Sequence, residues 1–202
     1  MKVVLLNGSP HPKGCTYTVL CEVARGLSES GVEAEILQIG REEIPGCKGC
    51  FACRKIGRCV QEDIVNRTAQ TIIESDGMII GSPVYFSSPN GTLVSYLDRL
   101  YAAYGDYLKY KPCGCMVSAR RAGTTSALEV LNKYPLVGEQ PLVSSSYWCM
   151  AFGNTPEEVR ADTEGMEIAY NLGCKMAWMV KALHGVPTPD DERAQNGQNG
   201  QI

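Results

Sequence analysis

Four cysteines lie within fourteen consecutive residues, in the stretch CKGCFACRKIGRCV at positions 47–60, which we call the cysteine segment. Their spacing, C-x2-C-x2-C-x5-C, places four thiols in one short connection. Thiols grouped in this way can bind a metal ion or an iron–sulfur cluster, form disulfides, or pack as small apolar side chains. The candidate ligands are Cys47, Cys50, Cys53 and Cys59.

These alternatives fit the spacing to different degrees. A zinc site usually combines two C-x2-C pairs about 15–20 residues apart, whereas the pairs overlap here. A C-x2-C-x2-C run supplies three corners of a four-iron cluster from one compact loop. Disulfides are disfavoured in a reducing compartment. The spacing favours a four-iron cluster, and a single ion or unmetallated cysteines stay open as alternatives.

Four basic residues alternate with these cysteines, and no acidic residue lies between positions 47 and 60. A cluster held by four thiolates carries net negative charge, so basic neighbours would stabilise it and raise its reduction potential. They would also favour the thiolate form that binds metal. The four are Lys48, Arg54, Lys55 and Arg58.

Composition limits the possible classes of protein. The formal net charge of −3 gives no support to a nucleic-acid partner. No apolar run reaches the ~20 residues that cross a membrane, and the N-terminus does not resemble a signal peptide, so we expect a cytoplasmic protein. Cys113 and Cys115 share one face of an expected strand, and we interpret them as core residues. Most other scattered cysteines are also expected to be buried, and His11 and His184 to lie at the surface.

Apolar runs alternate with longer amphipathic stretches, which predicts an α/β fold. We expect a doubly wound, five-stranded parallel sheet with helices on both faces. Asp63 is the expected N-cap of one helix, and Thr155 and Glu158 form a capping box with Pro156 at the first helical position. The expected strands are 2–6, 32–39, 76–83, 112–119 and 142–148, and the expected helices are 16–30, 63–75, 93–108, 125–134 and 155–183.

The loop after the first strand, residues 8–16, is suited to a phosphate. Its glycines permit sharp bends, and hydroxyls from Ser9, Thr16 and Thr18 could join the N–H groups of the following helix. The chain contains neither G-x-G-x-x-G nor G-x-x-x-x-G-K-[ST], which disfavours a dinucleotide loop and a nucleotide triphosphatase loop. Cys15 at the helix start could be unusually acidic, an effect that a nearby phosphate would partly cancel.

Two further strand-end loops suit a flat heterocycle. Residues 81–91 form an aromatic-bearing loop, and residues 118–125 form a polar loop with two arginines. Parallel strands end at the same edge of the sheet, where open α/β folds bind ligands. A phosphate loop together with these two loops indicates a flavin mononucleotide (FMN) site.

Three motifs carry a resemblance to a known family: GSP-x-x-x-G-x-T at 8–16, SPVYF-x-SPNG at 82–91 and SARRAGTT at 118–125. The chain resembles the flavodoxin-like NAD(P)H-dependent FMN reductases over residues 1–183, and the cysteine segment resembles their iron–sulfur flavoprotein branch. One departure is visible at residues 147–153, where YWCMAFG stands in place of the Y-W-N-x-V-H-G of relatives. That departure affects substrate or flavin-edge contacts made by the missing Asn and His.

The resemblance implies a set of site residues. The first loop would hold the FMN phosphate, the second would line the isoalloxazine and ribityl, and the third would complete the pocket. Cys15, within the first loop, is included with them. The implied cofactor-binding residues are Ser9, Lys13, Gly14, Cys15, Thr16, Pro83, Val84, Tyr85, Phe86, Ser118, Ala119, Arg120 and Gly123, and the implied cluster ligands are Cys47, Cys50, Cys53 and Cys59.

The implied function is an FMN-dependent oxidoreductase with a [4Fe–4S] cluster. Electrons would come from NAD(P)H or a reduced, ferredoxin-like carrier and reach a small acceptor. The alternatives are a plain NAD(P)H-dependent reductase of FMN, quinones, nitro or azo compounds, and a flavodoxin-like electron carrier that is not an enzyme. The resemblance also implies a homodimer or homotetramer. Residues 1–184 would form the FMN-binding domain, with the cysteine-rich insertion at about 45–62, and residues 185–202 a disordered polar tail.

Overall fold

A computed structural model describes residues 1–191, which are built around a parallel sheet. The strand order is β2-β1-β3-β5-β6, and a short β4 pairs antiparallel with the end of β3. Neighbouring strands of the main sheet are all parallel, as predicted. The bounds are β1 Lys2–Asn7, β2 Glu33–Gln38, β3 Gly77–Tyr85, β4 Ser88–Pro89, β5 Cys113–Ala119 and β6 Met150–Phe152.

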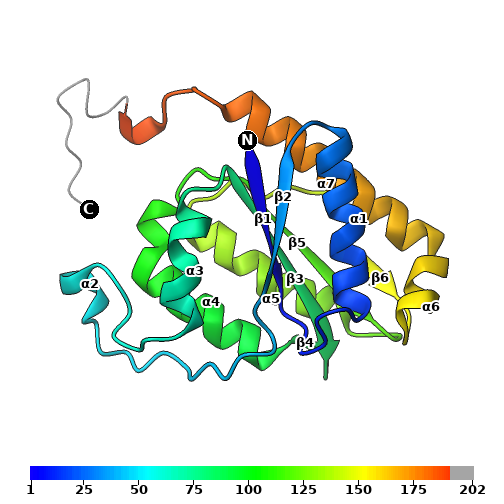
Figure 1. The fold of residues 1–202 in the computed structure, drawn as a ribbon, viewed down its shortest axis with the longest axis horizontal. Helices are drawn as coiled ribbons and strands as arrows, with labels where there is room; N and C mark the ends of the chain where they lie inside the picture. The colour runs from blue at the N-terminus through cyan, green and yellow to red at the C-terminus, as the bar shows by residue number, and fades with distance from the viewer. Residues whose placement is uncertain (192–202) are drawn as a thin grey trace.

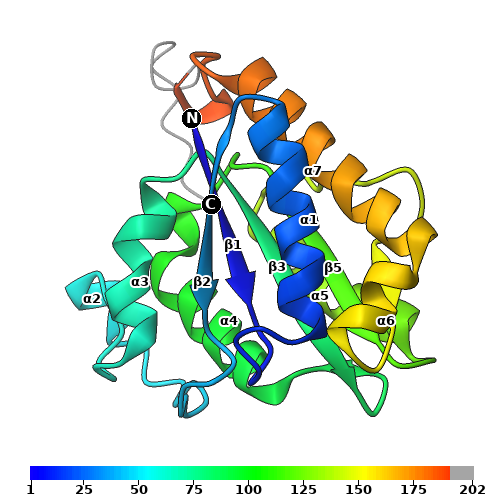
Figure 2. The ribbon, with the colours of Figure 1, turned by 45° about the vertical axis from the view of Figure 1, so that its right-hand side comes forward.

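Helices cover both faces of this sheet (Figures 1 and 2). On one face α1 and α7 pack so closely that a Cβ at Gly26 would lie 2.3 Å from the Tyr170 carbonyl oxygen. On the other face α3, α4 and α5 lie side by side, with α2 beyond α3 at the edge of the molecule. The bounds are α1 Cys15–Glu29, α2 Cys53–Ile56, α3 Ile64–Ile73, α4 Gly91–Tyr104, α5 Thr124–Val137, α6 Pro156–Ala161 and α7 Thr163–Leu183.

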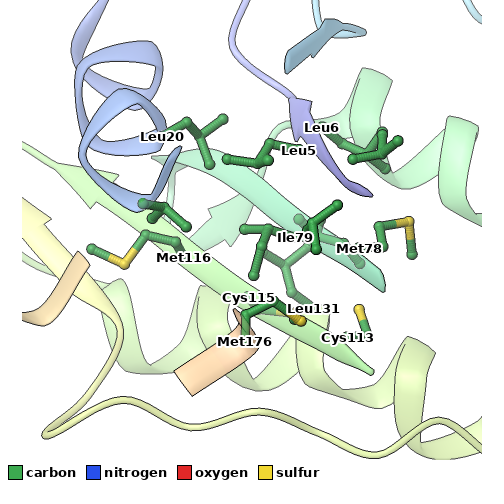
Figure 3. Close-up of a cluster of buried hydrophobic side chains, with 14 of the residues drawn as sticks. Leu5, Leu6, Leu20, Met78, Ile79, Cys113, Cys115, Met116, Leu131 and Met176 are labelled. Atoms are coloured by element: carbon green, nitrogen blue, oxygen red, sulfur yellow. The ribbon is translucent and has the colours of Figure 1, made fainter. Parts of the chain in front are cut away.

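The core lies on both faces of the central strands. Residues 3–6 and 78–80 are almost completely buried, which explains why these strands read as continuous apolar runs. Figure 3 shows Cys113 and Cys115 among the core side chains. Both thiols are buried, so the prediction that they are core residues is confirmed. Of the six scattered cysteines, these two and Cys149 are buried, Cys15 and Cys174 are half-buried and Cys21 is exposed, so the expectation that most are buried holds for three.

The last strand differs from the prediction. Residues 142–148 form only an isolated bridge between Leu142 and Cys113, and the strand β6 begins at Met150. In the intervening segment the Ser145 hydroxyl donates to the Ile168 carbonyl of α7 at 2.6 Å. Tyr147 and Trp148 are then more than half exposed. The chain returns to β5 through the Val117 N–H, which donates to the Cys149 carbonyl.

The predicted helix 155–183 is two helices, α6 and α7, separated at Asp162. Asp162 caps α7 by accepting from the Gly165 N–H, and its other oxygen accepts from the Phe152 N–H at 2.7 Å. The Thr155 cap of α6 is confirmed, because its hydroxyl accepts from the Glu158 N–H.

Asp63 is also confirmed as a cap, because its carboxylate accepts from the Val65 N–H at the start of α3. Of the predicted tail 185–202, the last part, residues 192–202, lies outside the described residues. Within residues 1–191, no helix combines the length and the apolar character that a bilayer crossing requires.

Candidate functional site

The strand-end loops enclose a cavity of about 260 Å³ at the carboxyl edge of the sheet. It lies where the strand order reverses between β1 and β3, the place at which doubly wound sheets bind ligands. Of the thirteen residues predicted to bind cofactor, nine line it, while Lys13, Gly14, Phe86 and Gly123 do not. The lining comprises Ser9, His11, Cys15, Thr16, Pro83, Val84, Tyr85, Ser118, Ala119, Arg120, Gly153 and Asn154.

Three of these residues were not predicted. His11 is exposed, as expected, yet it also borders the cavity. Gly153 and Asn154 follow β6, which the sequence placed several residues too early. A β6 ending at Phe152 would have indicated them, because the residues after each parallel strand meet at this edge.

The start of α1 can receive an anion. Its N-cap, Gly14, provides no side-chain hydrogen bond, and its first turn contains no acidic residue. The first N–H groups of the helix are therefore available, and the helix dipole favours negative charge there. Thr16 and Ser118 face each other at 2.8 Å between their hydroxyl oxygens and join the first and third loops. The Thr18 hydroxyl instead donates to the Gly14 carbonyl.

Cys15 does not have the acidic thiol considered from the sequence. Burial raises its pKa, and the nearby carboxylates of Glu158 and Glu157 act in the same direction. The thiol is half-buried in the cavity wall. It therefore adds no negative charge beside the anion site at neutral pH.

The second loop is a strand end and a tight hairpin rather than an irregular loop. β3 continues to Tyr85, and Phe86 and Ser87 form a two-residue turn to β4. Both turn residues have positive φ, 49° for Phe86 and 62° for Ser87, which matches the twist of a hairpin but strains a side-chain-bearing residue. Phe86 is fully exposed at the tip, and burial raises the pKa of Tyr85 at the cavity wall.

The three loops are held against one another. Asn90 donates to the Gly8 carbonyl at 2.7 Å, and the Gly8 N–H donates to the Gly81 carbonyl at 2.8 Å. A Cβ at Gly123 would lie 2.6 Å from the Ser87 hydroxyl oxygen, so the third loop touches the hairpin. Gly123 also has a φ of 82°, which favours glycine.

The four cysteines of the cysteine segment line a second, smaller cavity of about 30 Å³ at the edge of α4. Cys53 and Cys59 are half-buried, Cys47 and Cys50 are exposed, and all four are free thiols. Within the described part of the chain, no three His, Cys, Asp or Glu side chains are arranged as ligands of one metal ion.

Arg99 of α4 is the main contact residue of this segment and was not identified from the sequence. It is 1% exposed, and its Nε–H points to the Cys59 Sγ at 3.4 Å. Its two Nη groups bind Asp63 at 2.5 and 2.9 Å. Burial opposes its charge, but the bonds to Asp63 and Cys59 prevail and raise its pKa. Forty positions separate Arg99 from Cys59, so their spacing gave no signal.

Two basic residues within the cysteine segment, unlike Arg99, have partners other than its thiols. Arg58 pairs with Glu62, and the Arg54 guanidinium stacks 4.7 Å from the centre of the Phe51 ring. Both arginines are exposed to solvent, where water and salt weaken their field. The buried cation at the cysteines is Arg99.

A doubly wound sheet with an anion-binding helix start and a cavity at its switch point defines a flavodoxin-like, mononucleotide-binding protein. The chain belongs to the NADPH-dependent FMN reductase family, whose model matches residues 1–154, and within it to the iron–sulfur flavoprotein branch. It is therefore an FMN-dependent oxidoreductase.

Individual relatives agree with this assignment. An iron–sulfur flavoprotein of Methanocaldococcus jannaschii is 30% identical over 191 residues, which are 91% of this chain and 99% of that protein. One of Archaeoglobus fulgidus is 30% identical over 194 residues, 95% of this chain and 86% of that protein. The structure of a WrbA-like flavodoxin from Agrobacterium tumefaciens shares the fold, with a TM-score of 0.63 and 16% identity over 90% of this chain and 96% of that one.

Proposed function

We propose that this FMN-dependent oxidoreductase also holds a [4Fe–4S] cluster at its cysteine segment. It would take electrons from NAD(P)H or a reduced, ferredoxin-like carrier and deliver them to a small acceptor. The observation that carries the proposal is the presence of four free thiols around one cavity in a chain with a flavin-type pocket. The names of the relatives, iron–sulfur flavoproteins, support it. When bound, FMN exchanges one or two electrons and the cluster one.

The pocket residues fit FMN. The uncapped N–H groups of α1, with Ser9 and Thr16, offer donors to its phosphate. Pro83, Val84 and Tyr85 supply an apolar wall for a planar ring, and partial burial raises the pKa of the Tyr85 phenol, which stays neutral. Arg120 adds a positive charge at the third loop.

The thiols of the cysteine segment fit a cluster as a donor set. Cys53 and Cys59 are anchored to α4, through the Ala102 carbonyl at 3.3 Å and the Arg99 guanidinium. Cys47 and Cys50 lie on exposed chain beside Gly46 and Gly49, where an added Cβ would meet open space. The first pair is therefore preorganised, and the second pair has room to adjust around a group larger than the present cavity.

We also propose that copies of this chain associate through the hairpin side of the flavin pocket. Phe86 is fully exposed there. Large aromatic side chains are enriched at protein interfaces. Light scattering of the holoprotein should give a dimer or tetramer, and Phe86→Ser should shift it toward monomer. A wild-type monomer would contradict this part of the proposal.

The cofactor content tests the central proposal. Protein purified without oxygen should contain FMN together with iron and acid-labile sulfide in equal amounts. Cys47→Ser with Cys50→Ser should remove iron and sulfide but leave FMN, because the two cavities share no lining residue. Cys21→Ser, an exposed thiol outside the segment, is the matched control and should retain both. Flavin without sulfide in the wild type would refute the cluster.

A second candidate is a plain NAD(P)H-dependent reductase whose cysteines are structural. It is favoured by the lack of a three-ligand metal arrangement in residues 1–191. In that case Cys47→Ser with Cys50→Ser would leave turnover with NAD(P)H unchanged. The proposed function instead requires that electron transfer to or from a ferredoxin-like partner falls in this variant.

A further inference from the structure

Arg99 binds both ends of the cysteine segment as well as one of its thiols. Nη1 donates to the Pro45 carbonyl at 3.2 Å, before the first cysteine. Nη2 donates to the Gln61 carbonyl at 3.0 Å, after the last cysteine. Nε donates to Cys59 Sγ at 3.4 Å. One guanidinium on α4 thereby closes residues 45–61 into a loop whose base is fixed to the core.

Asp63 orients this guanidinium. Its two oxygens bind the two Nη groups, and one of them also accepts from the Val65 N–H at the start of α3. Because a guanidinium is planar, fixing its Nη groups also fixes the direction of the Nε–H. The Nε–H of Arg99 is then held toward the sulfur of Cys59.

Cys59 is held at its backbone as well. The Asn66 amide donates to the Cys59 carbonyl at 2.9 Å, and Tyr104 of α4 donates to the Asn66 side-chain oxygen at 2.8 Å. The position of the Cys59 backbone therefore depends on α3 and α4, and the environment of its sulfur depends on Arg99. None of the other three cysteines of the segment receives a hydrogen bond from a cationic side chain in the described structure.

We propose that Arg99 is a positioning residue that closes the cysteine segment and donates a charge-assisted hydrogen bond to the ligand sulfur of Cys59, thereby raising the reduction potential and the retention of the bound cluster. This inference rests on the proposed cluster. A hydrogen bond to a ligand sulfur favours the more negative, reduced state. Asp63 offsets the charge of Arg99 at a distance, so the direct N–H contact carries the effect.

Two variants separate this role from general stability. Arg99→Lys keeps a cation beside Asp63, but an ammonium has three donors and cannot reproduce the fork that reaches Asp63, Pro45, Gln61 and Cys59 together. Arg99→Gln with Asp63→Asn removes both charges, which avoids leaving a buried carboxylate unpaired. Arg67→Lys is the matched control, because Arg67 on α3 pairs with Glu42 but is exposed.

The readouts are the midpoint potential and electron paramagnetic resonance spectrum of the reduced cluster, the rate of iron loss to a chelator, and FMN per chain. Both Arg99 variants should show at least a tenfold fall in the reduced-to-oxidised ratio at fixed potential, equivalent to about 59 mV for one electron. They should also lose iron several-fold faster and show a changed spectrum. FMN per chain should stay at the wild-type level, and Arg67→Lys should match the wild type in every readout.

Wild-type potential and iron retention in both Arg99 variants would overturn the role of Arg99 while leaving the cluster intact. Equal loss of FMN and iron in both would show a general loss of structure and would also contradict it. A wild-type protein with FMN but no sulfide would refute the proposed function, and with it this inference. That failure is seen in the wild type alone, so it is distinguishable from the first.

Discussion

Cys15 illustrates how one side chain sets the charge of the flavin pocket. It is the first residue of α1, and burial raises the pKa of its thiol, so the residue is neutral where the phosphate of FMN would bind. The nearby carboxylates Glu157 and Glu158 strengthen this effect. A neutral group at this position leaves the helix N–H groups and their dipole free to attract an anion.

Replacing Cys15 by aspartate should therefore separate helix stability from FMN binding. Aspartate in the first turn of a helix interacts favourably with the dipole, so the FMN-free protein should lose little stability or gain up to about 0.5 kcal/mol. The same charge would repel the phosphate, and FMN affinity should fall by about threefold to tenfold.

Fluorescence titration with FMN and urea unfolding of the flavin-free protein measure the two effects. Cys15→Ser, which is neutral and of similar size, is the control and should bind FMN as the wild type does. Riboflavin, which lacks the phosphate, should discriminate much less between the two variants. Unchanged FMN affinity in Cys15→Asp would mean that the phosphate does not lie at the start of α1.

Asp162 connects three elements at the β6 side of the same pocket. It caps α7 through the Gly165 N–H and also accepts from the Phe152 N–H at the end of β6. Gly153 and Asn154, which line the cavity, follow immediately. A Cβ at Gly165 would come within 2.3 Å of an Asp162 oxygen, so glycine is required for this close contact.

Asp162→Ala should lower the free energy of unfolding by about 1–2 kcal/mol, because a cap is lost and the Phe152 N–H loses its partner. Asp162→Asn retains one oxygen acceptor and can keep one of the two hydrogen bonds, while its NH2 faces the other N–H, so it should cost less than Asp162→Ala but still destabilise the protein. Urea unfolding of both variants provides the comparison. Equal losses would contradict a stabilising contribution from the hydrogen bond that asparagine can retain.

The same junction shows where the sequence was informative and where it was not. The buried runs that form β1, β3 and β5 were recognisable because strands covered on both faces are continuously apolar. Residues 142–148 begin with an apolar pair but form no strand, and the Ser145 hydroxyl instead donates to the Ile168 carbonyl, a contact that spans 23 positions. Asp162 lies within an unbroken helical pattern, and the Phe152 N–H that donates to its second oxygen is brought near only by the fold.

The site residues also divide into those that the sequence could indicate and those that it could not. Most pocket residues were identified because the ends of parallel strands meet at one edge, which is a property of topology. Lys13 and Phe86 were placed at the pocket by resemblance, yet they do not line the cavity. Arg99 could not have been found, since an arginine in an amphipathic helix normally faces solvent and its burial depends on the pairing with Asp63.

The whole molecule keeps several titratable groups neutral by burying them. Burial raises the pKa of Cys115 well above its ordinary value, and the pKa of Cys149 to about 11. Tyr96 shifts in the same direction for the same reason. Each of these groups ionises at lower pH in the unfolded chain, so the folded state binds more protons over an alkaline range, and stability must fall as pH rises through that range.

Cys149 provides a measurable part of this loss. Its ordinary pKa of 9.0 becomes about 11 in the fold, so its contribution is complete below pH 9 and disappears as pH rises to about 11. A shift of that size corresponds to roughly 2–3 kcal/mol. Between pH 8 and pH 11, the free energy of unfolding of Cys149→Ala should therefore fall by roughly 2–3 kcal/mol less than that of the wild type. Urea unfolding of both proteins under reducing conditions measures this difference. Parallel pH dependences for the two proteins would contradict this, and would mean that the thiol ionises inside the fold by gaining access to water.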